Sequence, residues 1–180
     1  LFELTSTKYL ISRSINENKK WELVENETLP RVYIVSNYQI EKNLNKQLEI
    51  LFDDKFDPKS SVVLEESVNV EPNIVANYSI PNISPYESKQ VAIDTDTQTP
   101  GILILTDNFY PGWKAYIDGE ETKILRANYT FRAVEISSGK HNIEFVYQPD
   151  SVRNGIIISV FSLGVLSIIY FKRRHLSTLL

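Results

Sequence analysis

Short runs of apolar and β-branched residues, separated by turn residues, recur along most of the chain. From Ser61 onward this alternation predicts strands over 61–65, 73–80, 88–95, 101–107, 113–118, 121–126, 130–136 and 141–147. A β-branched and aromatic run predicts one more strand over 31–35. Many short strands with frequent turns are typical of two packed sheets. We therefore expect a mainly β protein, a β-sandwich of jelly-roll or immunoglobulin-like type, with Ile102 to Leu105 in a central strand because this run is apolar on both faces.

One predicted hairpin turns at Asp118-Gly119. This dipeptide favours a type I′ turn, because both central residues of that turn need a positive φ. A two-residue loop fixes the register as Ile117 opposite Glu120, Ala115 opposite Thr122 and Trp113 opposite Ile124. The side chains of one face, including Trp113, are then mostly apolar, so the register is consistent with a buried face.

A second predicted hairpin has residues 137–140 as its four-residue loop. The expected pairs are Ile136 with His141, Val134 with Ile143 and Arg132 with Phe145. This register also places mainly apolar residues on one face. We therefore expect the strands on either side of this loop to be neighbours in one sheet.

Two parts of the first sixty residues depart from the strand pattern. Ile40, Leu44, Leu48 and Leu51 recur at helical spacing, which predicts a short amphipathic helix over 40–51. Residues 1–11 fit either the end of a helix or a strand entering the domain. The polar segment 14–20 is expected to be a turn.

The last thirty residues contain a long apolar run. Gly155 to Phe171 is free of charges over 17 residues, a length of roughly 25 Å as a helix, near the lower limit for a bilayer core. A buried core helix is the alternative interpretation. The aromatic pair Tyr170-Phe171 and the basic cluster 172–174 favour a membrane helix at about 155–171 within the segment 151–180. The positive-inside rule then places residues 1–150 outside the cell membrane and the C-terminus in the cytoplasm.

Charge and composition narrow the class of function. The chain has 180 residues and a net charge of −4. Because residues 151–180 contain four basic and no acidic residues, the first 150 are more acidic still, and we expect no nucleic-acid partner. Cysteine is absent, which excludes disulfides and thiol chemistry. Methionine is also absent and the chain opens with Leu1, so we expect a piece of a longer protein.

Several polar residues and clusters are candidates for catalytic or metal sites. Asp94 with Asp96 fits an acid–base or metal pair, but turn carboxylates are the simpler interpretation. The acidic residues of 53–57 lack the glycine and glutamate of a calcium loop. His141 has no second histidine at ligand spacing, and the sequence holds no GxSxG elbow for a hydrolase triad. We expect no catalytic residue, no metal and no cofactor.

Aromatic residues near the predicted turns are the strongest indication of ligand binding. Aromatic faces can stack on sugars, while Arg and Asn side chains can hydrogen-bond to hydroxyl groups. The candidate glycan-binding residues are Tyr110, Trp113, Tyr129, Arg126 and Asn128. Core packing is the competing role for Trp113, because the hairpin register directs it to the apolar face.

Several motifs in the chain resemble one bacterial family. They are Tyr110-Pro111-Gly112-Trp113, Asp118-Gly119, Arg126-Ala127-Asn128-Tyr129, Gly139-Lys140-His141 and Tyr147-Gln148-Pro149. Further similar segments lie upstream: Thr7-Lys8-Tyr9-Leu10-Ile11, Leu29-Pro30-Arg31-Val32-Tyr33, Phe56-Asp57-Pro58 and Val62-Val63-Leu64-Glu65. Together they resemble the C-terminal extracytoplasmic domain and last transmembrane helix of the YfhO family of bacterial polytopic membrane proteins.

The resemblance implies a parent similar to glycosyltransferases of the GT-C type, which use polyprenyl-phosphate-linked sugars for cell-envelope polymers. The catalytic carboxylate of such enzymes is expected in an early loop between membrane helices, so no catalytic residue is assigned to this chain. The first hypothesis is a non-catalytic accessory domain that packs on the membrane part of its parent and holds a cell-envelope glycan or lipid-linked sugar. A carbohydrate-binding or adhesion module and a purely structural cap, both without an enzymatic parent, are the alternatives.

Overall fold

The computed structural model describes residues 9–13, 21–25, 28–71 and 79–177. It divides into two compact units, Leu1–Tyr147 and Gln148–Leu180. The first unit holds the strands and one short helix, and the second holds one long helix, α2 (Asp150–Ser177). The predicted turn over 14–20 and most of the predicted strand over 73–80 lie outside the described residues.

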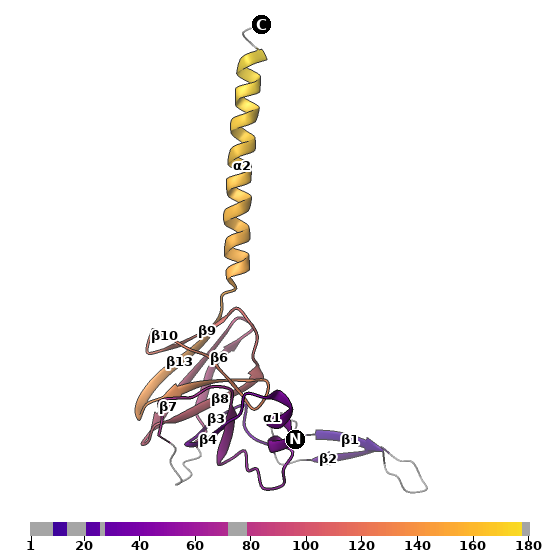
Figure 1. Ribbon diagram of the computed structural model, residues 1–180, viewed down its shortest axis with the longest axis vertical. Coiled ribbons are helices and arrows are strands. Elements are labelled where there is room, and N and C mark those ends of the chain that lie inside the picture. Colours follow the sequence, from indigo (N-terminus) through magenta and orange to yellow (C-terminus); the bar gives the residue numbers. More distant parts are fainter. Residues whose placement is uncertain (1–8, 14–20, 26–27, 72–78, 178–180) are drawn as a thin grey trace. The chain divides into compact units, whose positions relative to one another are not determined.

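Two sheets form the sandwich of the first unit, as the strand pattern predicts (Figure 1). The six-stranded sheet has the order β3 (Val32–Val35), β8 (Gly101–Asn108), β12 (Phe131–Ile136), β11 (Leu125–Ala127), β5 (Ser61–Leu64) and β4 (Asn37–Ile40). The five-stranded sheet has the order β10 (Glu120–Thr122), β9 (Trp113–Ile117), β13 (Gly139–Tyr147), β7 (Gln90–Thr97) and β6 (Asn82–Glu87). The pairs are antiparallel except for β4 with β5. A separate hairpin joins β1 (Tyr9–Arg13) to β2 (Trp21–Glu25).

The core has two halves, one on each face of the six-stranded sheet. Strand β8 shows this directly, because Ile102 and Ile104 belong to one cluster and Leu103 and Leu105 to the other. One cluster includes Leu51 of the short helix α1 (Leu44–Leu51), and the other joins the two sheets. The prediction of a central strand at 102–105 is confirmed. Fully burying each of these side chains contributes about 1.5–3 kcal/mol.

The hairpin at Asp118-Gly119 forms as predicted. Asp118 has φ 52° and Gly119 has φ 85°, as a type I′ turn requires. The pairs Ile117–Glu120 and Ala115–Thr122 are present. The expected pair of Trp113 with Ile124 is not formed, because the chain changes sheets after Thr122 and the predicted strand over 121–126 is split into β10 and β11. Ile124 packs on the core between the sheets, and Leu125 packs on the opposite face of the six-stranded sheet.

The second predicted hairpin is wrong. Strand β12 pairs with β8 and β11, whereas β13 pairs with β7 and β9, so the loop over 137–140 crosses from one sheet to the other. Nearly all of β12 is buried, as suits an inner strand with core on both faces, while residues 139–146 of β13 are buried on one face only. The loop between β7 and β8 crosses beside it, and Thr97 Oγ1 donates to the carbonyl oxygen of Ser137 over 3.3 Å.

Helix α1 begins later than predicted. Asn43 is its N-cap, and its Oδ1 accepts from the backbone N–H groups of Asn45 (2.9 Å) and Lys46 (3.3 Å). Ile40 belongs instead to β4. Strand β6 was not predicted, because Pro85 interrupts its sequence. A proline is tolerated there since β6 is an edge strand with a register irregularity between Ile83 and Tyr86.

Helix α2 contains a segment long and apolar enough to cross a membrane, from Asp150 to Ile169, with a mean hydropathy of 1.9. Three of the serines in this segment donate from their hydroxyl groups to backbone carbonyls four residues earlier. These bonds, each 2.8 Å, run from Ser159 to Gly155, from Ser162 to Ile158 and from Ser167 to Leu163. The hydroxyl groups are thereby satisfied within the helix, which lowers the cost of placing them in lipid.

Candidate functional site

A cleft of about 630 Å³ is lined by residues of both sheets. The six-stranded sheet contributes the end of β8 and Arg132 of β12, and the five-stranded sheet contributes Trp113 of β9 and Tyr147 of β13. Arg31, which precedes β3, and Tyr110, from the loop between β8 and β9, complete the mouth. The cleft therefore combines aromatic and charged groups, as binding sites for polar organic ligands do.

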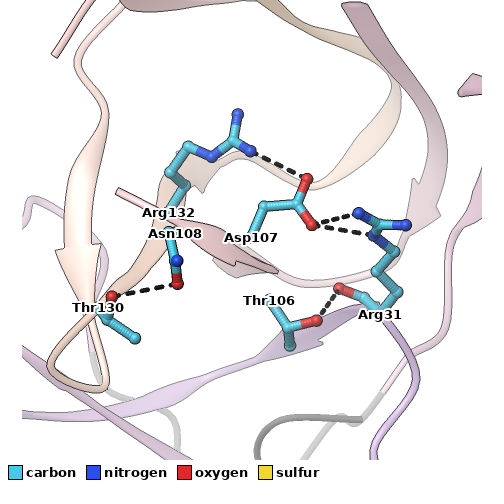
Figure 2. A network of polar contacts seen from close by, with 6 residues as sticks. All are labelled: Arg31, Thr106, Asp107, Asn108, Thr130 and Arg132. Atoms are coloured by element: carbon cyan, nitrogen blue, oxygen red, sulfur yellow. Dashed lines mark hydrogen bonds and ion pairs between the residues drawn. The ribbon is translucent and has the colours of Figure 1, made fainter. Parts of the chain in front are cut away.

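Asp107 contacts two arginines that line this cleft (Figure 2). Its Oδ1 accepts from Nε (2.9 Å) and NH2 (2.6 Å) of Arg31, and its Oδ2 accepts from NH2 of Arg132 (2.9 Å). The side chains of Arg132 and Asp107 are 3% and 13% exposed, whereas that of Arg31 is 43% exposed. Two guanidinium groups on one carboxylate leave the cluster with a net positive charge.

Neighbouring residues fix the position of this network. Thr106 donates to the carbonyl oxygen of Arg31 from its backbone N–H (2.9 Å) and its hydroxyl group (3.2 Å). On the following residue of β8, Asn108 Oδ1 accepts from the hydroxyl group of Thr130 over 3.3 Å. Figure 2 shows these contacts on both sides of Asp107. The arginines are thus held before any ligand arrives, which lowers the entropy cost of binding.

Arg132 also stacks on aromatic rings. Its guanidinium carbon lies 4.0 Å from the ring centroid of Trp113 and 5.6 Å from that of Phe145. Such cation–π contacts contribute about 0.5–2 kcal/mol each. The ring of Trp113 lies 5.4 Å from that of Tyr147 at 50°. Trp113 is half-buried, packs against the core between the sheets and lines the cleft, so it combines the two roles that its sequence position suggested.

The five predicted glycan-binding residues do not form one group. Tyr110 and Trp113 line the cleft, and Tyr110 is 62% exposed at its rim. Tyr129 is 39% exposed with φ 74° but does not line the cleft. Arg126 forms an ion pair with Glu65 over 3.2 Å and lies 5.0 Å from the ring centroid of Phe109.

Asn128 has a role inside the fold. It is 3% exposed, with φ 45°. Its Oδ1 accepts from the backbone N–H of Val63 (2.9 Å), and its Nδ2 donates to Tyr33 Oη (3.4 Å). Its amide group is therefore used to join β5 to the turn after β11, and we leave Asn128 out of the candidate site.

The sequence alone does not indicate seven of the nine residues that line the cleft, among them Arg31, Asp107, Arg132 and Tyr147. A signal is present for Arg132, because this arginine lies next to the apolar residues Ala133 and Val134 of a predicted strand, and a buried arginine has to be paired. Its partner Asp107 is 25 residues away, at the end of another strand. That pairing depends on β8 and β12 being neighbours, which local pattern alone does not establish.

The other acidic clusters serve turns and surface pairs. Asp53 and Asp57 accept from the backbone N–H groups of Lys55 and Lys59, each over 2.9 Å. Asp94 accepts from Asn142 Nδ2 (2.9 Å), and Asp96 lies 3.8 Å from Lys140 Nζ. Within the described part of the chain, no three His, Cys, Asp or Glu residues are grouped so as to hold a metal ion.

His141 lies between Asp118 and Ser137 at the start of β13. Its Nδ1 is 2.7 Å from Asp118 Oδ2, and its Nε2 is 2.8 Å from Ser137 Oγ. The hydrogen bond with Asp118, opposed by burial, raises the pKa of His141 above its usual value. The same bond, with that from the backbone N–H of Asn142, lowers the pKa of Asp118. Both groups are therefore charged over a wider pH range than they would be if they were not in contact.

Comparison with known proteins finds similarity to one family of bacterial membrane proteins. A family model described as "Bacterial membrane protein YfhO" matches residues 73–159. The Bacillus subtilis (strain 168) protein named "Uncharacterized protein YfhO" is 32% identical over 72 residues, which are 40% of this chain and 8% of that protein. The chain thus matches only a small part of this curated relative, and no solved structure matches.

The segment that matches the family model includes both the cleft and the start of the apolar helix. The matched segment contains the whole five-stranded sheet, the cleft residues Asp107 and Arg132, and the first ten residues of the apolar helix α2. Residues 73–159 of the chain are thus similar to the YfhO family of bacterial membrane proteins.

Proposed function

We propose that the first unit is an extracytoplasmic accessory domain of a polytopic membrane protein and that its cleft holds a cell-envelope glycan or a lipid-linked sugar. The cleft combines stacking surfaces on Tyr110, Trp113 and Tyr147 with two fixed arginines. Aromatic faces suit the C–H faces of sugars, and guanidinium groups donate to hydroxyl and phosphate oxygens. This juxtaposition is the observation that supports the proposal.

The net positive charge of the cleft favours a negatively charged ligand. Two arginines share Asp107, so the site carries one positive charge in excess. An excess positive charge with partly desolvated surroundings favours a ligand bearing a negative charge, such as a phosphate group. Arg31 is the arginine that stays accessible to such a ligand, since 43% of its side chain is exposed. The carboxylate of Asp107 is occupied by its bonds to both arginines and holds them in place, so the cleft is suited to binding.

The chain itself connects the cleft to the membrane segment. Tyr147 lines the cleft, and only Gln148 and Pro149 separate it from the start of α2. A ligand carried at the membrane surface suits this connection. The parent, in this proposal, resembles a glycosyltransferase that uses polyprenyl-phosphate-linked sugars, with its catalytic residues elsewhere.

Binding is tested with the full chain in detergent micelles by isothermal titration. The two probes are a glycerol-phosphate glycan and a neutral glucose oligomer. Because Tyr110 is exposed, Tyr110→Ala should leave folding intact and weaken binding of the charged glycan by about 3–10-fold. Tyr129→Ala is the matched control, an exposed tyrosine outside the cleft, and should bind like the wild type. Equal affinities for all three proteins would contradict the proposal.

Orientation requires its own test. The basic residues 172–174 follow the apolar segment, and we propose that they lie in the cytoplasm. Since the chain has no cysteine, single cysteines at Glu120 and Ser177 can be labelled without background from it. In cells, a membrane-impermeant maleimide should label position 120 and spare position 177. The reverse pattern would overturn the orientation.

A further inference from the structure

We propose that Ser137, His141 and Asp118 form an ester-cleaving site at the other end of β13 from the cleft. His141 and Tyr147 are six residues apart on this strand, a separation of about 20 Å. The two sites therefore use different residues, and this inference does not depend on the proposed glycan binding. It departs from the sequence analysis, in which the lack of a GxSxG elbow argued against a hydrolase triad.

The three side chains have the connectivity of a serine nucleophile, a histidine base and a carboxylate. His141 Nδ1 lies 2.7 Å from Asp118 Oδ2, and His141 Nε2 lies 2.8 Å from Ser137 Oγ. The carboxylate can only accept, so Nδ1 carries the proton in the neutral ring. That tautomer turns the lone pair of Nε2 toward the hydroxyl group of Ser137, as proton abstraction requires.

The backbone fixes Asp118 in this position. Its Oδ1 accepts from the backbone N–H of Asn142 over 2.9 Å, and its own N–H donates to the carbonyl oxygen of Asn142 over 2.9 Å. The type I′ turn at Asp118-Gly119 is thereby docked on β13 next to His141. Because the carboxylate is fixed by the fold and by a second donor, it can orient the imidazole ring without reorganising.

The exposure of Ser137 suits a nucleophile, and the carbonyl oxygen of Ser138 gives His141 a second hydrogen-bond acceptor. Ser137 is exposed, while the His141 side chain is only 16% exposed. The carbonyl oxygen of Ser138 lies 3.4 Å from His141 Nε2. It can accept only from a protonated Nε2, so it favours the imidazolium that forms when Ser137 gives up its proton.

A second cavity, next to Ser137, indicates the class of ester that the site would cleave. Ser137 also lines a cavity of about 590 Å³ whose apolar walls include Val70, Pro100 and Ile136. Glu71 and Glu135 line the same cavity and disfavour an anionic group there. The substrate class is therefore a neutral carboxylic ester with a small apolar acyl group.

The reaction needs only water as a co-reactant. Ser137 Oγ forms a bond to the ester carbonyl carbon while its proton moves to His141 Nε2. The carbon–oxygen bond to the leaving alcohol then breaks, and the alcohol takes the proton from Nε2. Water attacks the resulting acyl-serine with the same base, which releases a carboxylic acid and restores the hydroxyl group of Ser137.

The first test is covalent labelling of the full chain in detergent micelles with a fluorophosphonate probe, together with p-nitrophenyl butyrate hydrolysis. Ser137→Ala removes one exposed hydroxyl group and should lower both rates by at least about 100-fold. Ser151→Ala, which removes another exposed serine hydroxyl at the start of α2 and outside this site, is the matched control and should react like the wild type. Circular dichroism establishes that both variants fold. A folded wild type that does not react, or equal reaction of wild type and Ser137→Ala, would overturn the proposal.

The second test addresses the positioning role of Asp118 through the pH profile. The wild-type rate should rise with pH through the raised pKa of His141, because only the neutral ring accepts the proton. The charged group in contact with this ring is Asp118 of the turn, while Lys140, which precedes His141 on β13, pairs with Asp96 of β7. Asp118→Asn should lower both the rate and the pH at which it is half-maximal. A lower rate at an unchanged midpoint would assign Asp118 a merely structural role and overturn this part of the inference.

Discussion

The two ends of β13 place polar groups in different settings. At the Tyr147 end, Arg132 and Asp107 are 3% and 13% exposed, and Arg132 lies against the ring of Trp113. At the Gly139 end, His141 and Asp118 are 16% and 52% exposed and border a turn and a loop. The first end thus holds charges that stay fixed, and the second holds groups whose protonation changes with pH.

This difference decides what each end contributes to stability. A buried ion pair costs much desolvation, so removing one partner leaves the other charge poorly compensated. An exposed pair is screened by water and contributes little. Substitutions of the buried charged residues of the cleft should therefore act mainly on folding, and those near His141 mainly on chemistry. The following changes test this division, in order of decreasing effect.

Arg132→Ala should destabilise the protein most. It removes a buried guanidinium group together with its bond to Asp107 and its stacking on Trp113, and it should lower the free energy of unfolding by about 3–5 kcal/mol. Arg31→Ala is the control, because Arg31 binds the same carboxylate from a more exposed position and should cost about 1 kcal/mol or less. Urea denaturation of the full chain in micelles measures both. Similar losses for the two variants would contradict the importance of burial.

Asn128→Ala tests a buried polar group without charge. The backbone N–H of Val63 loses its acceptor, at about 1–3 kcal/mol. Alanine must also adopt φ 45°, which adds about 1–2 kcal/mol. Asn128→Gly keeps the backbone conformation accessible, so it should lose mainly the hydrogen bond. If denaturation gives the same stability for both variants, backbone strain does not explain the choice of asparagine here.

Gly119→Ala perturbs only the turn that carries Asp118. Gly119 has φ 85°, and an added Cβ would meet no atom within 4 Å, so the cost is backbone strain of about 1–2 kcal/mol. Thermal unfolding should show this modest loss. Fluorophosphonate labelling should slow at the same time, because the carboxylate of Asp118 moves with the turn. A loss of stability comparable to that of Arg132→Ala would contradict the assigned order.

The smallest effect is the pH dependence of stability due to His141. The folded pKa of His141 is raised above its ordinary 6.5, so its contribution is fully present below about pH 6.5 and is lost as the pH rises through the raised value. The folded pKa of Asp118 is lowered below 3.8, so its contribution is present above about pH 3.8 and is lost as the pH falls through the lowered value. The contact should therefore stabilise most between these limits. His141→Gln should flatten the dependence of the melting temperature on pH above about 6.5, and an unchanged slope would contradict the assignment.

Local sequence signals predicted part of this arrangement. The Asp118-Gly119 turn, the run at 102–105 and the apolar tail follow from features within a few residues of each other. The crossings between sheets do not, because the loop over 137–140 reads equally as a hairpin. Only the pairing of β12 with β8 and of β13 with β7 excludes that interpretation.

The candidate sites, too, could be predicted only where their residues are close together in the sequence. Tyr110 and Trp113 share one turn motif, and both line the cleft. The Arg31–Asp107–Arg132 network brings together residues of three separate segments, and Ser137, His141 and Asp118 meet only once the sheets are crossed. From the sequence, Asn128 is a candidate because its amide group can hydrogen-bond to sugar hydroxyl groups. Its positive φ and its bond to Val63 make it part of the core instead.

The central claim is that one end of β13 binds and the other end reacts. A crossed comparison of Tyr110→Ala and Ser137→Ala tests it most directly, with glycan affinity and fluorophosphonate labelling measured on the same preparations. We expect Tyr110→Ala to lose affinity about 3–10-fold and to label normally. Ser137→Ala should bind the glycan normally and lose labelling at least about 100-fold. Loss of both properties in either variant, while circular dichroism shows a folded protein, would contradict two separate sites.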